Sequence, residues 1–429
     1  MEIQELYQHF LLHPKVSTDS RNMPAGGIFF GIHGPNFNGN NFAHEALESG
    51  ASLVVADDPL LYGIKNIVVV EDSLKTLQDL ATFHRNMLNI PVIGITGSNG
   101  KTTTKELVKT VLETTFNTLY TKGNLNNHIG VPLTMLEITR DTEIAVIEMG
   151  ANHLGEIAEL CAIAQPTLGI LTNIGKAHLG GFGGLEGIIE TKKALYQAVS
   201  QKKGLVFVNS DNELLMELST GMNRWTFGTS NTVNTLCTEH DANPMLLLKY
   251  LYKDLEHTIQ TNLLGDYNYE NVLAALSVGQ YLNIATEVIN HALSIYTPSN
   301  NRSQLAETGT NVVFLDAYNA NPSSMQAAIS NFHKVKADKK FLILGDMLEL
   351  GDESEAEHQR VIRLLLDLEF DKVILVGPCF QESNTTSHFL AFPDAQAASE
   401  FLRKHPLIGY TVLLKGSRGL TMEKIMEVL

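Results

Sequence analysis

The stretch from Gly94 to Thr104, GITGSNGKTTT, constrains the fold of this chain more than any other feature. It follows an apolar run at Val92–Thr96 that predicts a buried strand, and it leads into a helical pattern at 101–116. A Gly-Lys-Thr sequence at such a junction is typical of a phosphate-binding loop, because the helix N-terminus and the loop N–H groups favour anionic oxygens. We therefore expect a strand–loop–helix unit within an α/β fold.

The residues of this loop predict how a nucleoside triphosphate would bind. Lys101 would reach the β- and γ-phosphates, and the Thr102 hydroxyl would hold Mg²⁺. Ile95 occupies the position of the first glycine in the Walker pattern, so an ordinary glycine turn before a lysine-bearing helix is the alternative. The motif alone does not distinguish hydrolysis, phosphoryl transfer and ligation. The candidate ATP-binding residues of the loop are Thr96, Gly97, Ser98, Asn99, Gly100, Lys101, Thr102 and Thr103.

The chain has 429 residues, too many for one hydrophobic core, since single cores stop growing at roughly 250–300 residues. Apolar runs alternate with helical patterns, which predicts βαβ units and mostly parallel sheets. We expect a small α/β domain at 1–84, a central domain with the phosphate loop at 85–298, and a doubly wound, Rossmann-like α/β domain at 299–429. Residues 225–264 look like an antiparallel extension. The expected strands are 53–56, 67–70, 92–96, 144–148, 168–172, 205–209, 312–316, 341–345, 373–377 and 412–415.

Composition narrows the class of protein. The formal net charge is -16, which disfavours a nucleic-acid partner, because phosphate neutralisation needs clustered Lys and Arg. The three cysteines lie far apart and predict neither a disulfide framework nor a zinc site. The first residues do not resemble a signal peptide, and no run of about 18 apolar residues predicts a membrane span. We expect a soluble cytoplasmic protein with no membrane contact.

A second candidate cluster consists of polar residues that follow the next predicted strands. Glu148 ends the strand at Ile144–Glu148, where α/β sheets place ligands, and its carboxylate could hold Mg²⁺. His178 follows the strand at 168–172, and structural and functional roles are both open for it. Lys192 lies on a helical pattern at 185–200, where a solvated charged face is the simpler interpretation.

These motifs resemble the Mur ligase family. The phosphate loop matches the family's Thr-Gly-x-x-Gly-Lys-Thr variant, which also lacks the first Walker glycine. His178 and Lys192 fall on a family histidine and on a lysine that the family carries in carbamylated form. The resemblance implies two Mg²⁺ sites, with Glu148, His178 and carbamylated Lys192 serving the second. The implied catalytic residues are Lys101, Glu148, His178 and Lys192, and the implied metal ligands are Thr102, Glu148, His178 and Lys192.

Further motifs resemble the branch of this family that adds D-alanyl-D-alanine. They are GNLNNHIGVPL at 123–133, DAYNANP at 316–322, LGDMLELG at 344–351 and LKGSRG at 414–419. The resemblance implies that Asn268 and Asn271 hold adenine, that Arg302 reaches the phosphates, and that Asp316 and Tyr318 contact the ribose and base. The implied acceptor-cleft residues are Asn126, Asn127, Asn319, Asn321, Lys415, Ser417 and Arg418.

The N-terminal segment carries the least specific part of the resemblance. Residues 17–21, STDSR, resemble a family motif that lies on the UDP-sugar, and residues 34–42 resemble its glycine/asparagine loop. The implied UDP-substrate residues are Ser20, Arg21, Asn38 and Gly39. Arg21 would pair with the pyrophosphate.

The resemblance implies a three-domain, monomeric, cytoplasmic enzyme. Its substrates would be ATP, UDP-N-acetylmuramoyl-tripeptide and D-alanyl-D-alanine, with Mg²⁺ as cofactor and an acyl phosphate as intermediate. Three alternatives remain: a ligase that adds another amino acid or makes folylpolyglutamate, a nucleotide-binding regulatory module without catalysis, and a P-loop kinase. The motif at 318–322 argues against both forms of the first alternative.

Overall fold

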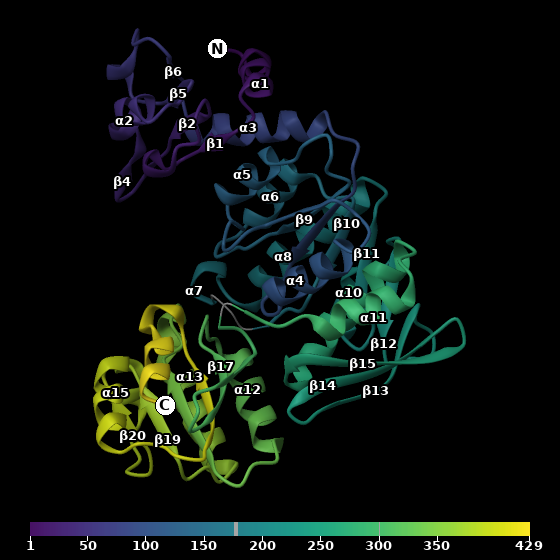
Figure 1. Ribbon diagram of the computed structural model, residues 1–429, viewed down its shortest axis with the longest axis vertical. Coiled ribbons are helices and arrows are strands. Elements are labelled where there is room, and N and C mark those ends of the chain that lie inside the picture. The colour runs from purple at the N-terminus through teal and green to yellow at the C-terminus, as the bar shows by residue number, and fades with distance from the viewer. Residues whose placement is uncertain (176–178, 300) are drawn as a thin grey trace.

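The computed structural model describes residues 1–175, 179–299 and 301–429, which form three main sheets with helices packed around them. In Figure 1 the N-terminal, central and C-terminal segments follow one another along the long axis of the molecule. The expected three-part α/β organisation is confirmed. None of the helices in the described part of the chain is both long and apolar enough to cross a membrane.

The N-terminal sheet has four parallel strands in the order β1-β2-β5-β6. The sequence predicted only β5 and β6, because β1 and β2 are short and are separated by turn residues. The short antiparallel pair β3–β4 lies at the start of the glycine/asparagine loop that the sequence indicated. The elements are α1 (Ile3–Leu12), β1 (Val16–Ser17), η1 (Ser20–Asn22), β2 (Ile28–Gly31), β3 (His33–Gly34), β4 (Phe37–Asn38), η2 (Gly39–Phe42), α2 (Ala43–Glu48), β5 (Leu53–Ala56), η3 (Pro59–Leu61), β6 (Ile67–Val69) and α3 (Ser73–Asn86).

The central sheet has nine strands in the order β15-β14-β13-β12-β11-β10-β7-β9-β8. Pairing is parallel from β8 to β13 and antiparallel from β13 to β15, so the expected antiparallel extension is confirmed. Its strands are β7 (Val92–Thr96), β8 (Thr118–Tyr120), β9 (Ile144–Glu148), β10 (Leu168–Leu171), β11 (Leu205–Asn209), β12 (Arg224–Gly228), β13 (Thr235–Ala242), β14 (Met245–Tyr252) and β15 (Leu255–Leu264). The helices of this segment are α4 (Lys101–Leu112), α5 (Gly130–Leu136), α6 (Glu156–Ala164), α7 (Leu179–Phe182), α8 (Leu185–Gln201), α9 (Glu213–Leu218), η4 (Asp266–Asn268), α10 (Tyr269–Tyr281) and α11 (Thr286–Ile295).

The C-terminal sheet has six strands in the order β16-β17-β21-β18-β19-β20, all parallel except the edge strand β16. The sequence did not predict the short edge strands β16 and β20. The elements are β16 (Gln304–Glu307), β17 (Val312–Asp316), α12 (Pro322–Lys334), β18 (Lys340–Gly345), η5 (Gly351–Glu353), α13 (Ser354–Asp367), β19 (Val373–Val376), α14 (Pro378–Ser383), β20 (Leu390–Phe392), α15 (Ala395–Lys404), β21 (Thr411–Lys415), η6 (Arg418–Leu420) and η7 (Met422–Val428).

The N-terminal and central segments share one buried apolar cluster. Phe10 on α1 and Leu77 on α3 belong to the same cluster as Met135 on α5 and Ile157 on α6. The α3 helix also makes polar contacts with the central segment, since Arg85 Nε donates to the Ala164 carbonyl at 3.0 Å. Most of the C-terminal segment is built around two further clusters on the faces of its own sheet.

Candidate active site

A cavity of about 740 Å³ lies between the central and C-terminal segments. On the side of the central segment it is lined by the phosphate loop, the end of β9 and the start of α10. On the side of the C-terminal segment it is lined by the ends of β17 and β21. Parallel α/β sheets place ligands at the carboxyl ends of their strands, and both sheets follow that rule here. The predicted residues that line the cavity are Ser98, Asn99, Gly100, Lys101, Thr102, Thr103, Asn126, Asn127, Glu148, Asn268, Asn271, Arg302, Asp316, Tyr318, Asn319, Asn321 and Lys415.

The phosphate loop depends on its two glycines. A Cβ atom on Gly97 would lie 1.9 Å from Thr172 Oγ1, and one on Gly100 would lie 2.5 Å from Asn271 Oδ1. Gly100 also has a φ of 78°, a conformation that L side chains rarely adopt. Behind the loop, Thr96 is fully buried and its hydroxyl donates to the Met149 carbonyl at 2.8 Å. Thr96 therefore supports the loop from beneath.

Two backbone N–H groups of the loop are already engaged. Ser98 N donates to the Asn173 carbonyl at 2.9 Å, and Asn99 N donates to Asn173 Oδ1 at 3.0 Å. The first helical residues, Lys101 to Thr103, have no partner within α4 for their N–H groups, because they lie in its first turn. The N–H groups at the N-terminus of α4 are therefore the ones open to an anion, whereas those of Ser98 and Asn99 already have protein partners.

Two lysine amines converge on one carbonyl of the loop. Lys101 Nζ donates to the Gly97 carbonyl at 2.8 Å, and Lys192 Nζ on α8 donates to the same oxygen at 3.0 Å. Burial lowers the pKa of Lys101 to about 8 and the pKa of Lys192 to about 7, and the charge of Lys101 contributes to the second shift. Lys192 is therefore not on a solvated face: it is 3% exposed and close to the phosphate loop.

Glu148 at the end of β9 presents one bonded and one unbonded oxygen. Its Oε1 accepts from Thr102 Oγ1 at 3.1 Å and from Asn126 Nδ2 at 2.8 Å. Its Oε2 is buried and has no hydrogen-bond partner among the residues that the structure describes. An orphaned carboxylate oxygen beside a threonine hydroxyl at a helix N-terminus fits a hard divalent cation such as Mg²⁺. His178, the other predicted ligand, lies outside the described residues.

Asn268 and Asn271 are linked to the phosphate-loop helix. Asn271 Oδ1 accepts from Thr104 Oγ1 at 2.9 Å, and Asn271 Nδ2 donates to Asn268 Oδ1 at 2.8 Å. Asn268 Nδ2 in turn donates to Ser303 Oγ at 3.2 Å, in the segment that enters the C-terminal sheet. The pair therefore connects α4 to the C-terminal segment, and only part of its hydrogen-bonding capacity faces the cavity.

Charges at the end of β17 are paired with those of β21. Lys415 Nζ lies 2.6 Å from Asp316 Oδ2 and 3.3 Å from the Asn319 carbonyl. Asp316 Oδ1 also accepts from Ser303 N at 3.4 Å. Lys415 is 1% exposed and the Asp316 side chain is 20% exposed, so this is a partly buried ion pair that joins the two strand ends beside the cavity.

Arg302 and Tyr318 interact directly with each other. The Arg302 guanidinium lies 3.7 Å from the centre of the Tyr318 ring, and the Arg418 guanidinium lies 5.5 Å from it. Arg302 Nε is buried and has no hydrogen-bond partner within the described part of the chain. The charge of Arg302 also contributes to lowering the pKa of Lys101, so the two cations are close together. That arrangement suits a highly charged anion between them.

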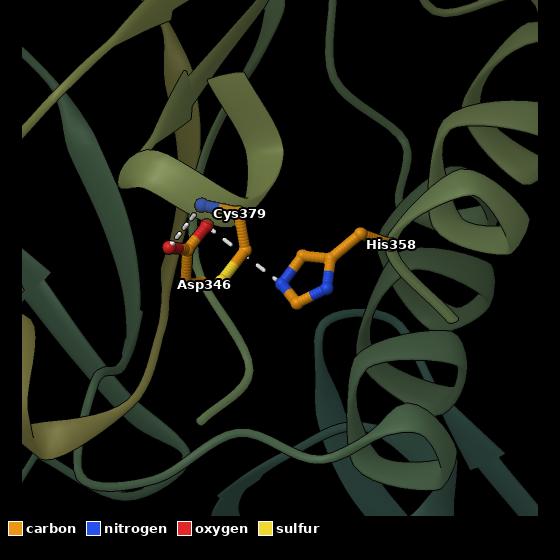
Figure 2. Close-up of side chains that lie close together, drawn as sticks. All are labelled: Asp346, His358 and Cys379. Atoms are coloured by element: carbon orange, nitrogen blue, oxygen red, sulfur yellow. Dashed lines mark hydrogen bonds and ion pairs between the residues drawn. The ribbon is translucent and has the colours of Figure 1, made fainter. Parts of the chain in front are cut away.

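A cluster of Asp346, His358 and Cys379, of which the first two are buried, lies at the carboxyl end of β18. Figure 2 shows the three side chains converging from the end of β18, from α13 and from the start of α14. Asp346 accepts from Cys379 N and from Phe380 N, each at 2.8 Å. His358 Nδ1 lies 2.7 Å from the Ser354 carbonyl, and its Nε2 accepts from Met347 N at 3.0 Å.

These bonds assign the cluster a structural role. The carbonyl at Nδ1 fixes the proton there, so the Nε2 lone pair is used by Met347 N–H and the Asp346 oxygens are used by two amides. Both His358 nitrogens and both Asp346 oxygens therefore already have partners, which argues against an open metal site. Ser417 is held by the same turn, since its N donates to the Asp346 carbonyl at 3.2 Å and its Oγ accepts from Leu348 N at 3.0 Å.

The predicted UDP-substrate residues lie in two turns beside α2. Ser20 is buried and its Oγ donates to Glu45 Oε1 at 2.9 Å. The exposed Arg21 is paired with Asp19, with Nε–Oδ1 at 2.9 Å and Nη2–Oδ2 at 3.0 Å. Asn38 caps η2 by accepting from Asn40 N at 3.0 Å. Gly39 is packed so closely that a Cβ would lie 2.6 Å from the Ile32 carbonyl.

A second cavity of about 490 Å³ adjoins Asn38. Its lining contains four carboxylates and no Lys or Arg: Asp57, Asp58, Glu71 and Asp72. Such a lining repels a diphosphate, so only Arg21, outside this cavity, offers a cation among the four predicted residues. The sequence therefore predicted residues of this region, but it did not predict the acidic cavity beside them.

Sequence reasoning missed residues that act through the loop. Thr172 Oγ1 donates to the Asn99 carbonyl at 2.6 Å, and Ser323 Oγ accepts from Asn99 Nδ2 at 2.9 Å. Thr172 and Asn173 follow β10, and strand ends beside a phosphate loop are the signal that could have identified them. No local pattern could have identified Ser323, because it lies 224 residues after Asn99 in the sequence.

Three domain descriptions of one family match successive parts of this chain. They are "Mur ligase family, catalytic domain" at residues 15–86, "Mur ligase middle domain" at 95–279 and "Mur ligase, glutamate ligase domain" at 301–418. The UDP-N-acetylmuramoyl-tripeptide–D-alanyl-D-alanine ligase of Bacillus subtilis strain 168 is 34% identical, with 98% of this chain and 94% of that protein covered.

Solved structures agree with the sequence relatives. A MurF crystal structure from Acinetobacter baumannii matches with a TM-score of 0.88 and 30% identity, covering 96% of this chain and 92% of that one. MurF ligase from Thermotoga maritima in complex with ADP matches with a TM-score of 0.87 and 28% identity, covering 97% of each chain. With its motifs, cavity and full-length relatives in agreement, the chain belongs to the Mur ligase family.

Proposed function

We propose that this protein joins D-alanyl-D-alanine to UDP-N-acetylmuramoyl-tripeptide with ATP, giving the pentapeptide precursor of peptidoglycan, ADP and phosphate. The observation that carries the proposal is the single cavity shared by the phosphate loop and the segment 316–322, whose sequence DAYNANP resembles the branch that adds this dipeptide. The relative from Bacillus subtilis is named for the same reaction.

The reaction has two steps in this proposal. The terminal carboxylate of the tripeptide attacks the γ-phosphorus of ATP, an acyl phosphate forms and ADP leaves. The amine of D-alanyl-D-alanine then attacks the acyl carbon, the amide bond forms, and phosphate leaves as the amine loses a proton. The reacting groups are anions, so Lys101, Arg302 and the N-terminus of α4 act by offsetting their charge and aligning them.

Thr102 and Glu148 would hold the Mg²⁺ that accompanies the triphosphate. The orphaned Glu148 Oε2 supports this assignment. Bound Mg²⁺ supplies Lewis-acid stabilisation of phosphate oxygens. A second Mg²⁺ is proposed at Glu148, His178 and Lys192, as the family resemblance implies.

Lys192 is proposed to be carbamylated. Its amine is buried, and the lowered pKa of about 7 leaves a large neutral fraction near neutrality. A neutral amine can attack CO₂, forming an N–C bond and releasing one proton, so that a cation becomes a carboxylate-like ligand. We expect Lys192→Ala to abolish turnover without rescue by bicarbonate. Normal turnover in this variant, or absence of a carbamate signal in ¹³C NMR of wild type under ¹³CO₂, contradicts the assignment.

The remaining assignments follow the family resemblance. Asn268, Asn271, Asp316 and Tyr318 are proposed for the nucleoside and Ser20, Arg21, Asn38 and Gly39 for the UDP-sugar. The acceptor cleft is proposed to contain Asn126, Asn127, Asn319, Asn321, Lys415, Ser417 and Arg418. We further propose a cytoplasmic monomer with domains at 1–84, 85–298 and 299–429.

The deciding experiment measures phosphate release from ATP with the UDP-linked tripeptide, with and without D-alanyl-D-alanine. Release that requires both substrates, with little release for single amino acids, is expected. Release driven by a single amino acid makes the protein a different ligase. ATP binding with no release favours the regulatory module, and transfer to a stable acceptor without an amine favours a kinase. Lys101→Ala is expected to lose ligation and keep its fold.

A further inference from the structure

Three side chains join the phosphate loop to the C-terminal segment in a closed ring. Asn321 Nδ2 donates to Asn99 Oδ1 at 2.7 Å, and Asn99 Nδ2 donates to Ser323 Oγ at 2.9 Å. Ser323 Oγ closes the ring by donating to Asn321 Oδ1 at 3.0 Å. Asn99 belongs to the loop between β7 and α4, and its two partners lie 222 and 224 residues later at the start of α12.

A backbone donor fixes the orientation of the ring. Asn321 is the N-cap of α12, and its Oδ1 accepts from Ser324 N at 2.9 Å. The oxygen of Asn321 therefore faces its own helix, and its Nδ2 must point away from it. Asn99 must then present its oxygen to that Nδ2, which leaves the Asn99 amide nitrogen to face Ser323.

The Asn99 side chain cannot move independently of the phosphate loop. Its backbone N donates to Asn173 Oδ1 at 3.0 Å, and its carbonyl accepts from Thr172 Oγ1 at 2.6 Å. With both backbone groups held by the residues after β10, the orientation of the side chain follows that of the loop. The N–H of Asn99 is also engaged, so binding phosphate directly is not its main role.

The segment between β17 and α12 is held at both ends. At its start Asp316 is paired with the buried Lys415 at 2.6 Å, and at its end Asn321 is bonded to Asn99. The intervening Tyr318 and Asn319 line the cavity. Breaking the Asn99 contact would free one end of this segment while the other end stayed fixed to the C-terminal sheet.

We propose that Asn99, Asn321 and Ser323 are positioning residues that form a latch, holding the segment 316–321 and the C-terminal sheet closed over the triphosphate on the phosphate loop. The role in catalysis rests on the proposed ligase function, whereas the closure itself requires only nucleotide binding. Because the latch lies between two segments of the chain and touches the loop that binds phosphate, it couples the position of α12 to the state of that loop.

Asn321→Ser separates the latch from the helix cap. A serine is still a good N-cap and can accept from Ser324 N, so α12 keeps its cap, but its shorter side chain has no amide group to donate to Asn99 Oδ1. Asn212→Ser is the matched control, because Asn212 caps α9 by accepting from Leu215 N at 3.2 Å and its capping bond stays within its own segment.

Small-angle X-ray scattering with a non-hydrolysable ATP analogue tests closure without any acceptor. We expect Asn321→Ser to show a larger radius of gyration than wild type, and Asn212→Ser to match wild type. An unchanged radius for Asn321→Ser, with a wild-type unfolding midpoint to show that it is folded, overturns the latch. Expansion without any ligation of D-alanyl-D-alanine by the wild type retains the latch and rejects the proposed function.

Steady-state kinetics test whether the ring acts as a unit. Asn99→Ala and Asn321→Ser should each lower kcat/KM for ATP about tenfold, an effect of a size expected when positioning is lost. The double variant should be no worse than the more damaged single variant, because either change opens the same ring. Losses that multiply to about a hundredfold in the double variant show that the residues act independently and overturn the proposal.

Discussion

The carboxyl ends of the central and C-terminal sheets face the same cavity but differ in how their charges are satisfied. At the central sheet, Glu148 Oε2 is buried without a hydrogen-bond partner in the described residues, and the amines of Lys101 and Lys192 both donate to one carbonyl. At the C-terminal sheet, Asp316 is paired with Lys415, and Asp346 accepts from two backbone amides.

This difference separates a binding site from its scaffold. Polar atoms without partners are costly when buried, and they persist where a ligand supplies the partner. Satisfied pairs instead fix the positions of strand ends. Substitutions at the central sheet should therefore impair chemistry more than stability, and substitutions at the C-terminal sheet should impair stability.

The strongest test is Glu148→Gln. The amide keeps the size of the side chain but removes the charge that would hold Mg²⁺, so turnover should fall at least about 100-fold. The thermal unfolding midpoint should stay close to that of wild type, because the amide oxygen can keep the bonds from Thr102 and Asn126 while a neutral NH₂ group replaces the unsatisfied carboxylate oxygen. Turnover within tenfold of wild type would remove Glu148 from the metal site, and a large fall in the midpoint would make it part of the scaffold.

For the C-terminal sheet we predict the opposite, a loss of stability, and the Lys415→Met variant tests it. It leaves the Asp316 carboxylate without its buried partner, which should cost about 3 kcal/mol of unfolding free energy. Urea unfolding measures the loss, and the double variant with Asp316→Asn should recover part of it. A cost below about 1 kcal/mol would show that this pair is solvated and unlike the scaffold described here.

Asp346→Asn tests the second satisfied group. An asparagine can accept from only one of the amides of Cys379 and Phe380 through its oxygen, and it turns its NH₂ group toward the other. The loss of these charge-assisted bonds should cost about 2 kcal/mol. The measurement is again urea unfolding, with Asp394→Asn, at the exposed cap of α15, as a control that should change little. Equal effects of the two variants would contradict the comparison.

The smallest effect is expected for Glu270, which lines the cavity at the start of α10. Burial raises its pKa from 4.5 to about 7, and the charge of Asp211 contributes to the rise. The folded chain therefore binds an extra proton between these values, and wild type loses stability as pH rises from about 4.5 to about 7. Glu270→Gln should be more stable than wild type at pH 8 and nearly equal to it at pH 4.5, measured by urea unfolding. The same difference at both pH values would contradict this origin.

Sequence patterns predicted the parts of the molecule whose structure is determined by residues close together along the chain. Val92–Thr96 and Lys101 could be identified because a buried strand, a glycine loop and a helix N-terminus leave a continuous signal. β1 and β16 could not, because strands of two and four residues at sheet edges lack a periodic pattern. The family resemblance, and not composition, moved Lys192 from a solvated face to the site.

The sequence also could not predict which protein partner a polar group takes in the folded chain. Asn99 was assigned to ATP, yet its side chain bonds to Asn321 and Ser323. Arg21 was assigned to a pyrophosphate, and in the structure Asp19 holds it. Such pairings depend on the distance between segments after folding, which spacing along the chain does not give.

The apolar cluster shared by α1, α3, α5 and α6 has a consequence for protein engineering. Cutting the chain after residue 84 would separate Phe10 and Leu77 from Met135 and Ile157, and would expose both halves of one core. A cut between α11 and β16 passes mainly between separate clusters. Fragments and chimaeras of this chain should therefore be divided there, with the first two segments expressed together as one piece.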